Sequence, residues 1–171
     1  MKRLVIFVAA VLVAASLLPL ALGPPATAGD PPDSFNMGPP NTAETSSGKT
    51  IRVSGAGSFD SGGDTVVAHG SFTRFNAAGA VIDRGTWEAT DFVSFNNADF
   101  GGPSPGFQGG ILTIKVTLFP HGGTPETNVT MIITCCVFGP GSCIEGATVV
   151  GTSVGDFTIK TGGLNLFHLR P

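Results

Sequence analysis

The feature that most constrains the fold is a strict alternation of apolar and polar side chains along residues 111–119. The polar side chains Thr113, Lys115 and Thr117 alternate with apolar ones, which are Leu112, Ile114, Val116 and Leu118. Residues 127–137 repeat the alternation with one apolar face made of Val129, Met131, Ile133, Cys135 and Val137. Because successive side chains of a strand point to opposite faces, both segments are predicted to be half-buried β-strands.

Six further segments have the same β character, with Thr, Val, Ile and Phe runs that end at Gly, Asn, Asp or Pro. They are residues 51–59, 65–75, 85–95, 147–150, 154–161 and 164–169. No window shows the apolar period of a capped helix. About eight strands with short connections predict an all-β fold, an antiparallel meander that closes into a small barrel and so removes the exposed edges of an open sheet. A two-sheet β-sandwich is the alternative.

Residues 1–28 are predicted to be a cleavable signal peptide. Lys2 and Arg3 precede an apolar stretch of about 15 residues, and Ala26-Thr27-Ala28 offers a cleavage site after it. The alternative is an uncleaved membrane anchor, but the stretch is shorter than the roughly 20 residues that span a bilayer. We therefore expect a secreted or extracytoplasmic protein that has no membrane segment after cleavage.

Residues 29–48 are rich in Pro, Gly, Ser, Thr and Asn and lack apolar periodicity. We expect a flexible Pro/Gly-rich tail there, with a short docking arm through Phe35 and Met37 as the alternative. Residues 49–171 then form the β-barrel domain, whose length of about 120 residues is common for a domain.

The charge of the chain argues against two classes of partner. The chain has 9 basic and 12 acidic residues. Cleavage of the signal peptide would remove Lys2 and Arg3, so the mature chain would have 7 basic and 12 acidic residues and a net charge of −5. Nucleic acids and anionic membrane surfaces select clustered Lys and Arg. The cations of this chain are scattered singly, so neither partner is expected.

The three cysteines predict one disulfide. An exported protein meets an oxidising environment, and Cys136–Cys143 is the predicted pair, with Cys135–Cys143 as the alternative. Strand parity turns Cys135 inward, where a thiol acts as a small apolar side chain; a reactive or intermolecular thiol is the alternative. No metal site is predicted, since the spacing C-C-x6-C matches no zinc pattern.

Four residues are candidates for a ligand site inside the barrel. Asp91 shares strand parity with Trp87 and Phe95, so it faces inward beside the one Trp of the chain if that face is buried. A carboxylate in such a place is costly without partners and is therefore a candidate ligand contact. Arg74, on the preceding predicted strand, is the candidate partner of Asp91. The alternative is a β-bulge that turns Asp91 outward, or a structural role in hydrogen bonding.

Gly85-Thr86-Trp87 is similar to the Gly-x-Trp of lipocalins and avidin-like barrels. In those families the motif lies on the first strand, whereas here it lies on about the third predicted strand, and the resemblance covers three residues. It implies a Trp that packs one end of a barrel, and it assigns the chain to neither family.

Three functional hypotheses remain. The first is a secreted binding module whose Phe-rich interior holds a small apolar ligand. Gly55, Gly57, Ala68 and Gly70 would leave room for it, or they would instead relieve strand curvature. The second is a structural or interaction protein with a filled core. The third, which rests on architecture, is an enzyme on a barrel similar to that of allene oxide cyclases or dirigent proteins. No catalytic residue and no cofactor is predicted, because no G-x-S-x-G nucleophile motif is present and the Gly-rich stretches precede no helix.

Overall fold

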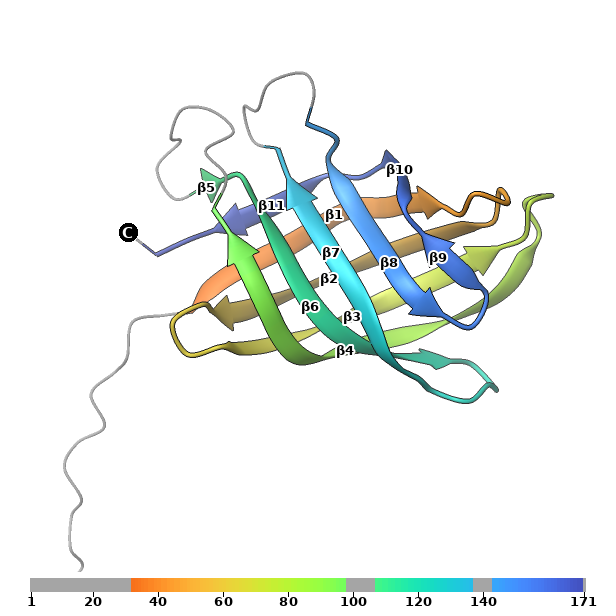
Figure 1. Ribbon diagram of the computed structural model, residues 1–171, viewed down its shortest axis with the longest axis horizontal. Coiled ribbons are helices and arrows are strands. Elements are labelled where there is room, and N and C mark those ends of the chain that lie inside the picture. Colours follow the sequence, from red (N-terminus) through yellow and green to blue (C-terminus); the bar gives the residue numbers. More distant parts are fainter. Residues whose placement is uncertain (1–31, 98–106, 137–142, 171) are drawn as a thin grey trace, which may run out of the picture.

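The computed structural model describes residues 32–97, 107–136 and 143–170. The predicted signal peptide lies outside these residues, as does most of the connection between residues 96 and 109. The described chain contains strands and no helix (Figure 1). The strands are β1 (Asp33–Glu44), β2 (Thr50–Asp60), β3 (Thr65–Phe75), β4 (Val81–Asn96), β5 (Phe107–Gln108), β6 (Gly110–Pro120), β7 (Glu126–Cys135), β8 (Gly146–Thr152), β9 (Gly155–Phe157), β10 (Ile159–Gly162) and β11 (Asn165–His168).

The strands form one antiparallel sheet in the order β5-β11-β1-β2-β3-β4-β6-β7-β8-β9, and β10 pairs with β1 beside β11. The sheet curls, so that β6, β7 and β8 lie across from β1, β2 and β3 in Figure 1. The predicted all-β antiparallel meander is therefore confirmed. The predicted strand 154–161 is divided at Thr158 into β9, which pairs with β8, and β10, which pairs with β1. The Thr158 N–H donates to the Glu44 carbonyl (3.0 Å) at this change of partner.

Strand β1 overturns the prediction of a flexible tail for residues 33–44. Its side chains Phe35, Met37 and Ala43 are buried, and its backbone pairs with β2, β10 and β11. The two prolines at 39 and 40 gave this segment the composition of a tail. In the sheet they fall where the register with β2 shifts, between Met37 and Asn41. A residue without an N–H is tolerated at such a bulge, because the ladder is already interrupted there.

Side chains join the two ends of the curled sheet along a seam between β7–β8 and β10–β11. Asn165 exchanges two hydrogen bonds of 3.0 Å with Asn41 and donates a third to the Thr134 carbonyl at 2.9 Å. The Asn165 N–H donates to Glu145, and Lys160 Nζ donates to Thr134 Oγ1 at 2.6 Å. Burial lowers the pKa of Lys160, and Glu145 opposes this in part. At the seam, side-chain hydrogen bonds therefore connect the strands that backbone hydrogen bonds connect in the rest of the sheet.

Trp87 lies in the middle of the core with no exposed surface, as its predicted inward face requires. Its indole N–H donates to the Ser54 carbonyl (3.0 Å). The indole occupies the space left by two glycines: a Cβ at Gly55 would lie 2.4 Å from Trp87 Cζ2, and one at Gly70 would lie 2.5 Å from Trp87 Nε1. These glycines therefore make room for the Trp, and not for a ligand.

A second aromatic group fills the core at the end where β2 turns into β3. Phe59 lies 4.9 Å from Phe95 and 6.1 Å from Phe92 between ring centroids, and Phe95 lies 5.3 Å from Phe167. Such edge-to-face and offset pairs are favourable beyond the area they bury. Phe35 contacts the same group through Phe167.

Asp91 is exposed, so the hypothesis that it faces inward beside Trp87 was wrong, and the alternative, a β-bulge that turns it outward, is the one observed. The register between β4 and β6 shifts twice, once between Ala89 and Asp91 and once between Phe92 and Ser94. Each β-bulge inserts one residue and reverses the faces of the residues that follow. The two shifts turn Asp91 outward and return Phe92 and Phe95 to the core side.

Candidate functional site

The one arginine in the core lies near the end of β3 that is remote from the Phe group. Inward residues alternate along β3, and Ala68, Phe72 and Arg74 are all buried. Only 1% of the Arg74 side chain is exposed. Its guanidinium lies over the Phe72 ring, 5.2 Å from the centroid, a cation–π geometry.

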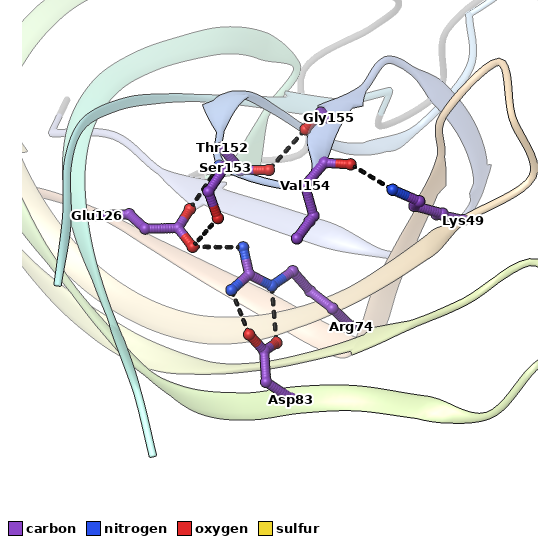
Figure 2. Close-up of polar contacts among 8 residues, drawn as sticks. All are labelled: Lys49, Arg74, Asp83, Glu126, Thr152, Ser153, Val154 and Gly155. Atoms are coloured by element: carbon purple, nitrogen blue, oxygen red, sulfur yellow. Dashed lines mark hydrogen bonds and ion pairs between the residues drawn. The ribbon is translucent and has the colours of Figure 1, made fainter. Parts of the chain in front are cut away.

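Two carboxylates from different strands hold this guanidinium (Figure 2). Asp83 of β4 faces Arg74 in the β3–β4 register and accepts a forked pair of hydrogen bonds, Nε to Oδ1 at 2.7 Å and Nη2 to Oδ2. Glu126, the first residue of β7, places Oε1 2.8 Å from Arg74 Nη1. Forked Arg–carboxylate pairs fix geometry as well as charge, so β3, β4 and β7 are tied together at this point.

Ser153, in the turn between β8 and β9, fixes the Glu126 carboxylate in turn. Its N–H donates to Oε2 at 3.0 Å and its hydroxyl donates to Oε1 at 2.7 Å. Burial raises the pKa of Glu126, but the hydrogen bonds from Ser153 and the Arg74 charge outweigh this and hold it below its ordinary value. Burial likewise works to lower the pKa of Arg74, and Asp83 and Glu126 together raise it. Arg74 and Glu126 are therefore both ionised near neutral pH.

A pocket of about 440 Å³ opens above this ion group. Arg74, Asp83, Glu126 and Ser153 supply its polar side, and Pro120, Pro125 and Val154 supply apolar walls, with Gly123 and Thr124 at the β6–β7 turn. Figure 2 shows the Val154 side chain pointing toward the guanidinium, while Lys49 Nζ donates to the Val154 carbonyl (3.0 Å) and anchors that turn. The volume falls in the range of small-molecule sites, which often lie at barrel mouths.

Arg74 Nη1 is the one polar side-chain atom, among the described residues, that is buried and lacks a hydrogen-bond acceptor. Glu126 Oε1 lies 2.8 Å away as the ion-pair partner of this nitrogen. The nitrogen has no exposed surface, so a molecule in the pocket does not contact it unless a neighbouring side chain moves.

The four predicted ligand-binding residues do not form one site. Arg74 lines the pocket, but its partners are Asp83 and Glu126, and not Asp91. Trp87 is enclosed in the core, and half-buried Phe95 belongs to the Phe group at the other end of the β2–β3 hairpin. The sequence analysis did not identify Asp83 and Glu126. Asp83 could have been identified, because Arg74 and Asp83 flank the Asn76–Gly79 turn and therefore face each other across a hairpin.

Cys136 and Cys143 form the predicted disulfide, with Cα atoms 5.9 Å apart. Cys135 is buried, and its thiol donates to the Asn165 carbonyl at 2.9 Å, at the seam. Within residues 32–97, 107–136 and 143–170, no group of three or more His, Cys, Asp or Glu side chains is placed to hold a metal ion. The same residues contain no helix that is long and apolar enough to cross a membrane. A disulfide-bonded β domain of this kind is compatible with a location outside the cytoplasm.

Comparisons with known proteins add no relative: no family model, no curated protein and no solved structure matches the chain.

Proposed function

We propose that the chain is a secreted binding module that holds one small ligand in the Arg74 pocket. The observation that carries this proposal is the pocket of about 440 Å³, whose polar side is the ion group of Arg74, Asp83 and Glu126 and whose other walls are apolar. Secretion is supported by the predicted signal peptide and by the Cys136–Cys143 disulfide.

The lining of the pocket defines the class of ligand. Pro120, Pro125 and Val154 offer contact to a compact apolar body, and the Thr124 hydroxyl offers a hydrogen-bond donor. Because Asp83 and Glu126 already neutralise the guanidinium, an anionic ligand would meet a local excess of negative charge. The ligand is therefore a small, mainly apolar and uncharged molecule with one acceptor oxygen, such as a phenol, an alcohol or a ketone.

Ligand-observed NMR with paired fragments tests this proposal. The oxidised mature protein is titrated with p-cresol and cyclohexanone, and with toluene and methylcyclohexane as matched molecules without the oxygen. We expect saturation transfer to the oxygenated fragments and a shift of the Arg74 guanidinium resonances. Equal transfer to both members of each pair, or none to either, contradicts the proposal.

A pair of exposed threonines gives matched variants. Thr124 lines the pocket, and Thr127 lies three positions further along the chain, is also exposed and does not line it. Thr124→Trp is expected to fill the pocket and abolish the NMR signal, while Thr127→Trp leaves it unchanged. A Thr124→Trp variant that binds as well as the native chain places the fragments elsewhere.

The filled-core interaction protein remains a second candidate, and the seating of Trp87 against Gly55 and Gly70 favours it. Native mass spectrometry of the mature protein from its own host separates the two. A mass excess that is present in the native spectrum and lost on denaturation supports the ligand-binding module. A bare polypeptide mass in both spectra supports the filled-core candidate.

A further inference from the structure

The ladder between β3 and β4 stops before β3 does. Strand β3 pairs with β2 along its whole length, from Thr65 to Phe75, but with β4 only from His69 to Phe75. Residues 65–68 and the whole of β4 are described, so the gap between them belongs to the sheet. Strand residues alternate the direction of their N–H and C=O groups, so one edge of residues 65–68 presents backbone groups that pair with no strand among the described residues.

The bulges of β4 cause this gap and the core maintains it. Beyond Glu88, β4 continues to pair with β6 while its register shifts twice, and bulges bend the strand that contains them. Phe92 and Phe95 of this part of β4 pack against Phe59. The aromatic contacts therefore hold β4 in the bent course that leaves the edge of β3 open.

The gap forms a groove of about 290 Å³ that is lined by Val66, Val67, Ala68, His69, Glu88 and Ala89. Val67 is 74% exposed, more than any other large apolar side chain in the described ranges. Proteins usually protect an open edge with Lys, Pro or an inward charge. Thr65-Val66-Val67-Ala68 carries none of these, so this edge is suited to receive a strand.

The charged residues around the groove favour one kind of added strand. Glu88 lines it, and the exposed Asp64 directly precedes Thr65 in the chain. No Lys or Arg lines the groove, and the cation nearest in register is Lys115, which faces Asp91 from the β6 side. A cationic partner is therefore favoured electrostatically.

We propose that this groove binds an extended basic peptide segment, which adds to the edge of β3 at residues 65–68 as a further strand. Backbone hydrogen bonds supply the pairing, as in other cases of strand addition. On the outer face that Val67 shares with Glu88, an apolar side chain of the peptide packs on Val67, and cationic side chains two positions away face Glu88 and Asp64. This site is separate from the Arg74 pocket, and it stands whether or not that pocket binds a ligand.

Fluorescence anisotropy with three labelled hexapeptides tests the proposal on the oxidised mature protein. The probe, the Lys–Val peptide, has the sequence Lys-Thr-Val-Thr-Lys-Thr, which places its Lys and Val side chains on one face of a strand. One comparison peptide has Glu in place of each Lys, and the other is the Lys–Val peptide methylated at every backbone nitrogen. We expect the Lys–Val peptide to bind and each comparison peptide to bind at least about tenfold more weakly. Equal binding of the methylated peptide overturns strand addition, because that peptide keeps its charge but has no N–H to donate.

Two exposed valines give a matched pair of variants. Val67→Lys puts a like charge in the groove, and Val81→Lys makes the same change at the first residue of β4, where the side chain is 58% exposed. We expect Val67→Lys to weaken the Lys–Val peptide at least about tenfold and Val81→Lys to leave it unchanged. An unchanged affinity in Val67→Lys overturns the proposal. So does a native chain that binds no peptide and forms a Val67-dependent dimer in sedimentation, since the occupant is then a second copy.

Discussion

Replacing Arg74 by Met tests the ion group at the pocket most directly. Met keeps an unbranched side chain of similar length but removes the positive charge that Asp83 and Glu126 share. Breaking a buried ion pair by removing one partner costs about 3–5 kcal/mol, because the remaining charge is left without compensation. Here two carboxylates remain, but their side chains are 23% and 14% exposed and water reaches them. We therefore expect a loss near the lower limit, about 3 kcal/mol at pH 7.

The loss is predicted to shrink in acid. The pKa of Glu126 is held low in the folded chain, so its contribution to stability is present above its ordinary pKa and is lost as the pH falls through the folded value. A protonated carboxyl is uncharged, so removing Arg74 then leaves no uncompensated negative charge. The free energy of unfolding of the native chain is therefore expected to approach that of Arg74→Met below about pH 4.

Urea titrations at pH 7 and in acid, followed by the fluorescence of the one Trp, measure both effects. Arg84→Met is the control, since Arg84 is exposed on the neighbouring strand and should change stability by less than about 0.5 kcal/mol. A loss at pH 7 no larger than that of the control would refute the energetic role of Arg74. So would a difference between the native chain and Arg74→Met that stays constant with pH.

Three further changes address the rest of the fold. Trp87→Ala empties the centre of the core and is expected to cost about 3–5 kcal/mol in a denaturant titration followed by circular dichroism; a loss within about 0.5 kcal/mol would place Trp87 on the surface. Asn165→Ala leaves Asn41 unsatisfied at the seam and is expected to cost at least about 1–3 kcal/mol, with faster amide exchange in β8 and β11 as its local signature. Replacing both Cys136 and Cys143 by Ser is expected to cost about 2.5 kcal/mol from the lost loop constraint, and an unchanged urea midpoint would contradict that value.

The sequence predicts the parts of the fold that depend on local periodicity. The inward faces of β6 and β7 are those that alternation assigned, and β3 spans the predicted residues 65–75. Register shifts are not visible in alternation, because one inserted residue reverses every face after it. Asp91 was misplaced for this reason, and β1 was missed because prolines at a bulge resemble prolines in a tail.

The candidate site was predictable in part for the same reason. Arg74 was named as a candidate ligand-binding residue, but as the partner of Asp91, and the disulfide pair followed from spacing. Glu126 contacts Arg74 only because the curled sheet brings β7 across from β3. Ser153 contacts Glu126 because the β8–β9 turn lies beside the start of β7. Such contacts depend on closure of the whole sheet, which no local pattern encodes.

The pairing of β1 with β11 has a consequence for how the molecule reaches its native state. Asn41 and Asn165 are 124 positions apart in the chain, and a polypeptide is synthesised from its amino end, so β1 is present long before β11. Until then, one side of β1 has no neighbour, and closing so long a loop costs entropy before any contact repays it. Completion of the sheet is therefore a late and slow kinetic step, and a chain truncated before residue 165 would retain an open, aggregation-prone β1 edge.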